Sequence, residues 1–256
     1  MAFQFDLAKI QWVKGHRNMP EAHYVFKVPS VTAILGEIPD PDFDAFVAAV
    51  GKEKADQIMN AAGQRGSAMH TFLENFISKY SSNKDISEAL KFTQEESVKS
   101  LLEEKIPEDK IDIGRNLFYK FYYSDYSTKY IDVLAMELPI FSPTYFYRGK
   151  LDILFKDKLF GLAVTDFKSS AAKIKKGSVK EYKYNLQLGA YANAIDEMYK
   201  SKGIIINYAS ILCIDKQHDA LEEISSSGAE LAKHKEEFKT LCKEWHIKYN
   251  QEFLIA

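Results

Sequence analysis

Residues 149–170 read GKLDILFKDKLFGLAVTDFKSS, two apolar runs joined by a short polar turn. Apolar, aromatic and β-branched residues in runs of this length predict a hairpin of two buried strands. Each run nevertheless carries charge, with Asp152 in the first and both Asp166 and Lys168 in the second. Because burying an unpaired charge costs several kcal/mol, these three side chains require counter-charges or a metal ion.

The alternation of side chains along a strand decides what these charges face. Asp166 and Lys168 project from one face of their strand, and Phe167 points to the other. With the turn midway between the two runs, Asp152 lies opposite Asp166 on the neighbouring strand. Two facing carboxylates repel unless a cation separates them, and oxygen ligands suit Mg²⁺ or Mn²⁺. The alternative is a structural ion pair with Lys150 or Lys168.

The rest of the chain reads as helices followed by strands. Helical spacing of apolar residues predicts helices at 42–50, 53–62, 67–80, 86–102, 111–123, 183–200 and 229–249. Runs rich in β-branched and aromatic residues predict strands at 131–141, 145–155, 159–168 and 205–214. This order implies an α/β or α+β protein in which helices pack against one sheet.

Composition limits the class of protein. The chain has 256 residues, 46% of them hydrophobic, which suits one large domain, and its formal net charge of -2 provides no overall basic field. The two cysteines, Cys213 and Cys242, are too few for a four-cysteine iron–sulfur or zinc site. No apolar run is long enough to span a bilayer, and the first residues lack a signal-peptide pattern. We therefore expect a cytoplasmic protein with no membrane partner.

Four segments resemble the motifs of PD-(D/E)XK nucleases, and of RecB-type nucleases in particular, in the order in which that family carries them. They are RGSAMHTFLENFI at 65–77, GKLDIL at 149–154, TDFKSS at 165–170 and NLQLGAYANAI at 185–195. VPSVTAIL at 28–35 is similar to the PSVT-x-x-L segment of the mitochondrial genome maintenance exonuclease branch and its phage and bacterial relatives. Together the motifs cover most of residues 28–195.

The resemblance implies an α/β fold with a restriction-endonuclease-like core, in which a mixed β-sheet is flanked by helices and carries an N-terminal helical cap. It favours a single nuclease domain over residues 1–256. Residues 1–130 would form the mainly helical cap, through which relatives thread a single-stranded end. Residues 131–256 would form the catalytic core.

The same resemblance assigns the site residues. The catalytic set is Asp152, Asp166, Lys168, Gln187 and Tyr191. The metal ligands are His70, Asp152, Asp166, the backbone carbonyl of Phe167, and Glu137. One or two Mg²⁺ or Mn²⁺ ions are the expected cofactors, and no iron–sulfur cluster is expected. Lys168 would orient or deprotonate the attacking water, with its pKa lowered by the adjacent cation.

Several of these residues also have an ordinary structural interpretation. His70 and Glu74 lie four residues apart on one helix face, where a histidine often only packs and a glutamate often faces solvent. Glu137 would equally serve as a solvent-exposed charge on an edge strand. Gln187 and Tyr191 share a helix face as well, so ordinary helix packing is an alternative to a catalytic role.

A lysine-rich segment follows the second strand of the hairpin. KSSAAKIKKGSVKEYKY at 168–184 holds six lysines against one glutamate. Its position after the predicted metal strand indicates attraction of phosphates, although such loops are often only solvated. The aromatic run YYSDYSTKY at 122–130 either stacks unpaired bases or packs in the core. The expected nucleic-acid-binding residues are Ser30, Thr32, Ser169, Lys173, Lys175 and Lys176.

Together these features predict a metal-dependent DNA exonuclease that prefers single-stranded ends and hydrolyses phosphodiester bonds, and the family resemblance implies products with 5′-phosphates. The alternatives are a structure-specific flap endonuclease or repair nuclease on the same fold, and a non-catalytic nucleic-acid-binding subunit. No G-x-x-x-x-G-K-[ST] motif occurs, so ATP-driven unwinding would need a separate protein. We expect a monomer whose partners are single-stranded DNA or DNA ends, with a helicase, polymerase or single-strand-binding protein.

Overall fold

One five-stranded sheet organises the structure. The computed structural model describes residues 28–217 and 221–249, and its strand order is β1-β2-β3-β4-β5. β3 and β4 run parallel, whereas the other neighbouring pairs are antiparallel, so the sheet is mixed as predicted. The strands are β1 (Val133–Ser142), β2 (Tyr147–Asp157), β3 (Gly161–Ser170), β4 (Tyr208–Asp215) and β5 (Glu222–Ser227).

Helices precede, interrupt and follow these strands. Ahead of β1 come α2 (Val31–Leu35), α3 (Pro41–Val50), α4 (Lys52–Asn83), α5 (Ile86–Glu103), α6 (Glu108–Tyr122) and the 3-10 helix η3 (Asp125–Thr128). Between β3 and β4 lie α7 (Val179–Met198) and the 3-10 helix η4 (Lys200–Lys202), and α8 (Gly228–Lys248) follows β5. A helical crossover is what two adjacent parallel strands require. None of the helices within residues 28–217 and 221–249 combines the length and apolarity that a membrane span needs.

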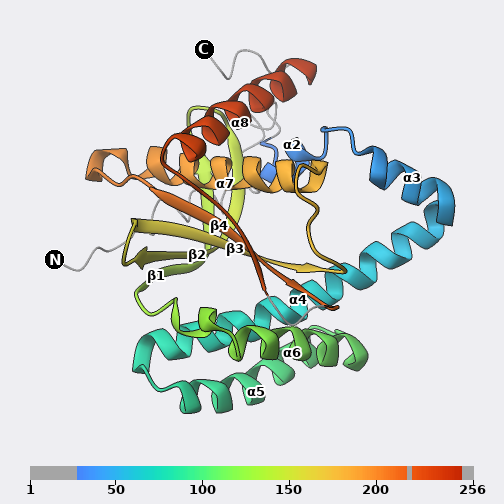
Figure 1. Cartoon of the computed structure of the whole chain (residues 1–256), viewed down its shortest axis with the longest axis vertical. Coiled ribbons are helices and arrows are strands. Elements are labelled where there is room, and N and C mark those ends of the chain that lie inside the picture. The colour runs from blue at the N-terminus through green and yellow to red at the C-terminus, as the bar shows by residue number, and fades with distance from the viewer. Residues whose placement is uncertain (1–27, 218–220, 250–256) are drawn as a thin grey trace, which may run out of the picture.

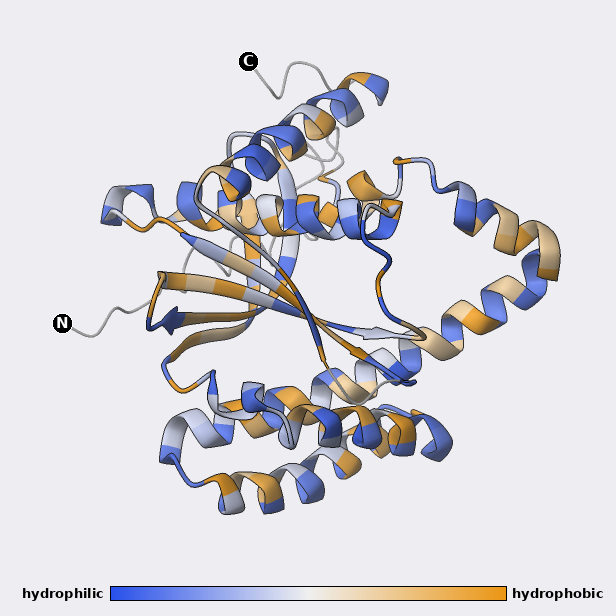
Figure 2. Cartoon of the chain, in the orientation of Figure 1, coloured by the Kyte–Doolittle hydropathy of each residue, from blue (hydrophilic) through white to orange (hydrophobic). Residues whose placement is uncertain are grey.

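The helices cover both faces of the sheet (Figure 1). α4 and α6 lie against one face, with α5 packed on α4 on the side away from the sheet, and α7 and α8 lie against the other. Each face has its own hydrophobic core, with Phe76 and Phe167 buried on the α4–α6 side and Leu154 and Ile195 on the α7–α8 side. Figure 2 shows apolar residues concentrated along the strands and on stripes of the helices. The predicted α/β class is therefore confirmed.

The hairpin of β2 and β3 has the predicted register. Ile153 pairs with Thr165, and continuing this antiparallel register by one residue places Asp152 opposite Asp166. Asp157 closes the turn, because its Oδ1 accepts two backbone hydrogen bonds at 2.7 and 3.1 Å. Local pattern and turn length are sufficient to set this alignment.

Two helices differ from the sequence-based expectation. The helices expected at 53–62 and 67–80 are one continuous helix, α4, with Gly63 and Gly66 inside it. An isolated glycine weakens a helix by only about 1 kcal/mol, so packing of α4 against the sheet overrides it. α7 begins at Val179, earlier than the expected residue 183, because Ser178 Oγ caps it by accepting the N–H of Glu181 at 3.2 Å.

Two elements were not expected from the sequence. The short helix α2 begins at Ser30, whose side chain caps it. The strand β5 reads EEISSS and lacks the apolar alternation that predicts strands. It forms because β4 offers an antiparallel edge, with Ile211 paired to Ile224 and Tyr208 to Ser227.

A glycine allows α6 to cross α4 closely. A Cβ at Gly114 would lie 2.5 Å from the Cβ of Ala68 and 2.8 Å from the backbone nitrogen of Met69. No larger residue fits there without moving the α4 backbone. Ala68 and Met69 directly precede His70, so this crossing fixes the part of α4 that carries the histidine.

Candidate active site

Three carboxylates form a row across three adjacent strands. The register of β1 with β2 places Glu137 opposite Asp152, and the register of β2 with β3 places Asp166 on the other side of Asp152. Asp152 and Asp166 are only 9% and 2% exposed. Like charges that face one another on neighbouring strands are destabilising. This carboxylate row therefore needs positive charge to offset it.

The backbone at Glu137 departs from a regular strand. Its φ is 50°, in the left-handed region that non-glycine residues rarely adopt. Such a conformation persists only where the surrounding structure holds it, and it often marks a functional site. One ligand atom from each of Glu137, His70 and Asp152 lies within 4.8 Å of the others. The strained residue thus directs its carboxylate toward Asp152 and His70 and not outward from an edge strand.

Asp152 is held by the neighbouring strand and lies beside a histidine. The backbone N–H of Phe167 donates to Asp152 Oδ2 at 2.6 Å, and His70 Nδ1 lies 3.4 Å from the same oxygen. Burial, and after it the charge of Asp166, raises the pKa of Asp152 well above its ordinary value. Ionising Asp152 is therefore unfavourable in the protein alone, and a bound cation would reverse that balance.

His70 reaches the carboxylate row from α4. Burial, opposed by the charge of Asp166 and assisted by the charges of Lys168 and Lys150, lowers the pKa of His70 to about 4. The imidazole is consequently neutral at neutral pH, so its contact with the aspartate is not an ion pair. A neutral imidazole has a lone pair available for a metal. Glu74, one turn further along α4, is exposed, in agreement with its solvent-facing interpretation.

Lys168 and Asp166 share one face of β3, as predicted, and form an ion pair. The Lys168 ammonium contacts Asp166 Oδ2, which is buried and has no other partner among the described residues. Burial by itself lowers the pKa of Lys168, but the charges of Asp166 and Asp152 outweigh burial and raise it. Lys168 is therefore an ammonium in the protein alone. The lowered pKa expected for its catalytic role would require a cation next to it.

Gln187 and Tyr191 reach the row from α7. Gln187 Nε2 donates to Asp166 Oδ1 at 3.4 Å and to the Tyr191 hydroxyl at 2.8 Å. The pair therefore contacts the row at Asp166. Tyr191 also packs against Gly149, where a Cβ would lie 2.9 Å from the tyrosine ring. Gly149, the glycine of GKLD, thus leaves room for the Tyr191 ring. The metal-binding role expected of this motif does not by itself explain why a glycine is needed there.

Phe167 and Ser169 lie on the opposite face of β3 from Lys168. The Phe167 ring is buried edge-to-face against Phe121 and Tyr130, with centroids 6.0 and 5.7 Å away. This anchors the backbone of Phe167 beside His70, whose pKa it raises through a backbone hydrogen bond. Ser169 faces α4, since a Cβ on Gly66 would lie 3.3 Å from Ser169 Oγ.

The donor set fits a hard divalent cation. Carboxylate oxygens with one imidazole are ligands that Mg²⁺ and Mn²⁺ accept. His70, Glu137 and Asp152 converge, and Asp166 Oδ2, which is buried and paired with Lys168, is a further acceptor in the row. PD-(D/E)XK-type motifs and the observed geometry therefore point to the same residues.

Ion pairs engage two members of the row. Lys168 pairs with Asp166, one of the alternatives that the sequence leaves open. Lys150 pairs with Glu137 and not with Asp152. The Lys150 side chain is 63% exposed, so solvent screens its attraction for the carboxylate. Glu137 lies on β1, outside the β2–β3 hairpin, so the register of that hairpin does not predict this contact.

The residues expected to bind nucleic acid occupy two further places. Ser30 Oγ accepts the N–H of Ala33 at 3.1 Å and lies 3.0 Å from Thr32 Oγ1, so both hydroxyls take part in the cap of α2. Ser30 also bridges to Arg148 at the start of β2. No hydrogen bond or ion pair joins these hydroxyls or the loop lysines to the carboxylate row within the described residues. The exposed segment after β3 carries Lys173, Lys175 and Lys176.

Much of the aromatic run at 122–130 belongs to the core. Tyr130 is 1% exposed and packs edge-to-face on Phe155 at 5.0 Å. The Tyr126 hydroxyl donates to Glu223 at 3.0 Å. Tyr123 differs, because it is 78% exposed. The packing interpretation therefore holds for Tyr126 and Tyr130.

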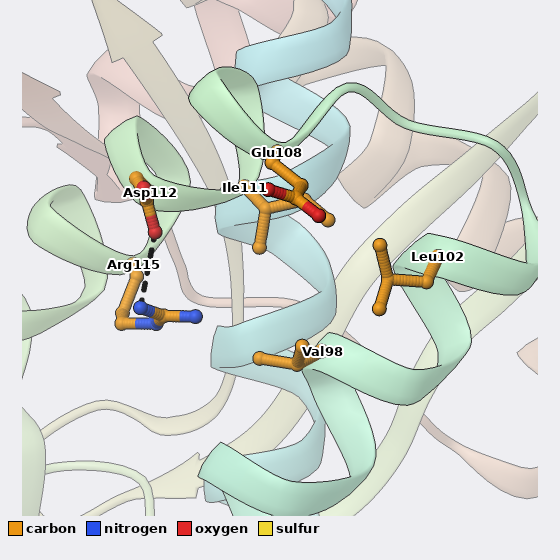
Figure 3. A pocket seen from close by; sticks show the side chains of 6 residues that line it. All are labelled: Val98, Leu102, Glu108, Ile111, Asp112 and Arg115. Carbon is orange, nitrogen blue, oxygen red and sulfur yellow. Dashed lines mark hydrogen bonds and ion pairs between the residues drawn. The ribbon is translucent and has the colours of Figure 1, made fainter.

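A separate pocket of about 150 Å³ lies between α5 and α6 (Figure 3). Val98 and Leu102 of α5 form its apolar side. Arg115 of α6 donates to Asp112 at 3.0 Å and lies over the Phe72 ring at 5.9 Å. These contacts stabilise the helical layer, and the pocket is distinct from the carboxylate row.

Comparison with known proteins agrees with this geometry. A search of curated proteins finds no match. Among solved structures, the crystal structure of a candidate exonuclease from Eubacterium rectale is similar with 11% sequence identity, over 71% of this chain and 68% of that chain, at a TM-score of 0.40. A family model described as the PD-(D/E)XK nuclease superfamily matches residues 44–254, well over half of the chain. The matched region holds His70, the carboxylate row and Lys168, and the chain therefore belongs to the PD-(D/E)XK nuclease superfamily.

Proposed function

We propose that this nuclease is a metal-dependent DNA exonuclease of RecB-like type that prefers single-stranded ends and hydrolyses phosphodiester bonds. The observation that carries the proposal is the carboxylate row of Glu137, Asp152 and Asp166 beside Lys168. Buried carboxylates that repel one another destabilise a protein that binds no cation. A subunit that only binds nucleic acid has no need of such a row.

The proposed metal site is built from side chains of four elements. The convergence of His70, Glu137 and Asp152 supports their role as ligands, and the buried position of Asp166 opposite Asp152 supports its inclusion. The carbonyl of Phe167 would complete the set. One or two Mg²⁺ or Mn²⁺ ions bound there would withdraw charge from the scissile phosphate and lower the pKa of the attacking water. Since imidazole suits Mn²⁺ better than Mg²⁺, His70 favours manganese.

The remaining residues would position the reacting groups. Lys168 would orient the attacking water or help to remove its proton, and its ion pair with Asp166 supports a place within reach of the row. Gln187 and Tyr191 would hold Asp166 in position through their hydrogen bonds. The product would be a 5′-phosphate.

The substrate and its surroundings are also part of the proposal. The exposed lysines after β3 support binding of a polyanion. A helical cap over residues 1–130 that threads a single-stranded end, a monomeric state and a cytoplasmic location stay predictions. Cooperation with a helicase, polymerase or single-strand-binding protein stays a prediction as well.

Cleavage of end-labelled DNA tests the proposal. Linear single strands with one terminus blocked at a time, a covalently closed single-stranded circle and a duplex of the same sequence are incubated with Mg²⁺ or Mn²⁺. We expect the linear strand to be degraded from an open end, the duplex to be degraded more slowly and the circle to persist. Degradation of the circle at the rate of the linear strand would favour the endonuclease alternative. Tight binding with no cleavage of any substrate would favour a binding subunit.

A further inference from the structure

A groove opens immediately beyond β3. It has a volume of about 520 Å³ and lies between α3 and the segment 170–180 that leads from β3 into α7. Ser170, which lines it, is two residues after Lys168 and four after Asp166, or about 7 and 13 Å along the strand. A chain bound in the groove could therefore continue past Lys168 to the carboxylate row.

One wall of the groove is aromatic. α3 contributes Phe43 and Phe46, whose ring centroids lie 6.3 Å apart with an interplanar angle of 39°. Phe43 is 41% exposed, and none of the ten residues of α3 is buried. Figures 1 and 2 show α3 standing at the margin of the molecule, clear of the sheet, with apolar positions along it. Packing of the fold does not account for these two rings.

The opposite wall carries positive charge. Lys173 and Lys175 line it and are exposed, and no ion pair engages either lysine within residues 28–217 and 221–249. Asp40 also lines the groove, but its carboxylate already caps α3 at the N–H of Phe43 and pairs with Lys183 at 3.4 Å. The other charged lining residues are Asp42, Lys173, Lys175 and Lys180, so the charge left to attract a ligand is mainly cationic.

We propose that this groove binds the unpaired nucleotides of a DNA strand next to the scissile phosphate, with bases against Phe43 and Phe46 and phosphates near Lys173 and Lys175. The inference rests on the proposed nuclease function and names the residues that select a single strand. Base faces stack on aromatic rings whatever the sequence, and lysines attract phosphates. A duplex hides its base faces in its own stack. Only an unpaired strand presents rings to one wall and phosphates to the other.

Paired substitutions on α3 isolate the role of the rings. The test variant is Phe43→Ala with Phe46→Ala, and because no residue of α3 is buried we expect its unfolding temperature to match wild type. Phe43→Leu with Phe46→Leu retains apolar side chains but removes the aromatic faces. The matched control is Phe92→Ala on α5, since Phe92 is 38% exposed and lies outside the groove.

Binding is measured by fluorescence anisotropy without added metal, so that no strand is cleaved. The probes are a short single-stranded oligonucleotide and a strand of the same length made of abasic sites. The double alanine variant should bind the oligonucleotide roughly 10- to 100-fold more weakly, as expected for the loss of one or two stacked bases. The double leucine variant should lose affinity as well. Neither change should alter binding of the abasic strand, and Phe92→Ala should alter neither probe.

The lysine wall has its own readout. Replacing Lys173 and Lys175 with alanine should weaken binding of both probes. The slope of log affinity against log salt should flatten by roughly 0.7 for each phosphate contact that is lost. An unchanged slope would assign the two lysines to solvent and overturn their part of the proposal.

Two further outcomes separate failure of this inference from failure of the proposed function. If the double alanine variant bound the oligonucleotide as tightly as wild type, or lost affinity equally for the abasic strand, base stacking in the groove would be overturned. A small phosphodiester, bis(4-nitrophenyl) phosphate, reports on the metal site alone. Wild type and the control Phe92→Ala should hydrolyse it with Mn²⁺ at equal rates. Absence of hydrolysis by wild type would overturn the nuclease proposal, while the binding measurements would still decide the groove.

Discussion

Two acidic clusters on the same sheet differ in how their charge is satisfied. Glu223 of β5 accepts hydrogen bonds from Lys129 at 2.7 Å, Tyr208 at 2.8 Å and Tyr126 at 3.0 Å. Asp152 of β2 accepts one backbone hydrogen bond at 2.6 Å and faces a carboxylate on each side. The first cluster is complete within the protein, and the second is not.

The pKa values of the two clusters move in opposite directions. Burial alone would raise the pKa of Glu223, but Lys129 and Tyr208 outweigh burial and hold it below its ordinary value. Burial and Asp166 instead raise the pKa of Asp152. A carboxylate that is surrounded by hydrogen-bond donors and a cation stabilises the fold. A carboxylate that faces other carboxylates lacks such partners and is suited to binding a cationic ligand. This contrast distinguishes a structural acid from a candidate metal ligand without using a sequence motif.

The largest expected effect is on turnover. Lys168→Met should lower kcat by about 10²- to 10⁴-fold, the usual contribution of a positioned acid–base group, while metal and DNA still bind. Single-turnover cleavage and calorimetric Mn²⁺ binding measure the two quantities. Lys129→Met is the matched control from the Glu223 cluster, and it should lower Tm but leave kcat unchanged. A wild-type kcat for Lys168→Met would erase the functional difference between the clusters.

The next effect is on metal affinity. Asp152→Asn keeps an oxygen for the N–H of Phe167 but removes the charge. Mn²⁺ affinity should fall by about 10- to 100-fold or more. Mutation of a residue that only hydrogen-bonds to a metal ligand already lowers metal affinity by that factor, and Asp152 is a proposed ligand itself. Without metal, the free energy of unfolding should stay equal or rise, since repulsion from Asp166 is removed. Thermal unfolding without Mn²⁺ measures the metal-free stability, and the gain in Tm on adding Mn²⁺ reports the loss of metal affinity. Strong destabilisation of the metal-free variant would make the row a structural element.

Glu223→Gln should have the opposite effect on stability. It should lower the free energy of unfolding by about 2 kcal/mol at pH 7, because a hydrogen bond to a charged group is worth about 1.5–3 kcal/mol and the Lys129 ion pair is lost. Denaturant unfolding measures the change. Small-phosphodiester hydrolysis serves as the control and should remain at the wild-type rate.

The difference in the free energy of unfolding between wild type and Glu223→Gln should depend on pH if it is electrostatic in origin. The folded pKa of Glu223 lies below the ordinary value of 4.5, so the unfolded chain binds more protons between the two values. The stabilisation is therefore fully present above about pH 4.5 and is lost as pH falls through the folded pKa. Wild type and Glu223→Gln should converge in acid. A difference that stayed constant down to the lowest pH at which both fold would point to packing instead.

The smallest effect is expected at the histidine. His70→Ala removes a neutral ligand, so it should raise the Mn²⁺ concentration for half-maximal activity by only about ten-fold and leave metal-free stability close to wild type. A metal titration of activity, with thermal unfolding beside it, measures both. Glu74→Ala, one turn along α4 and exposed, is the control and should change neither. An unaltered titration for His70→Ala would leave only its packing role.

Local pattern made the centre of the site predictable. The hairpin alignment of Asp152 with Asp166 follows from a period of two and a short turn, and both are properties of adjacent sequence. The shared face of Asp166 and Lys168 follows from the same period. The family match then confirmed the superfamily that these spacings resemble.

Other features escaped prediction because they depend on neighbours. The residues of β5 have little strand propensity, and pairing with the edge of β4 decides their conformation. The continuity of α4 through Gly63 and Gly66 depends on burial of its apolar face against the sheet. The left-handed backbone at Glu137 has no local signal, since glutamate does not favour it.

By itself the sequence determined which strands carry charge, and hence the superfamily, because spacing within a hairpin is set by bonds between near neighbours in the chain. Only the tertiary structure decided that Gln187 of α7 meets Asp166 of β3 and that α3 faces the lysine segment across a groove. These contacts join segments far apart in the sequence. Their formation depends on the packing of helices and strands around two cores, and no local propensity encodes that packing.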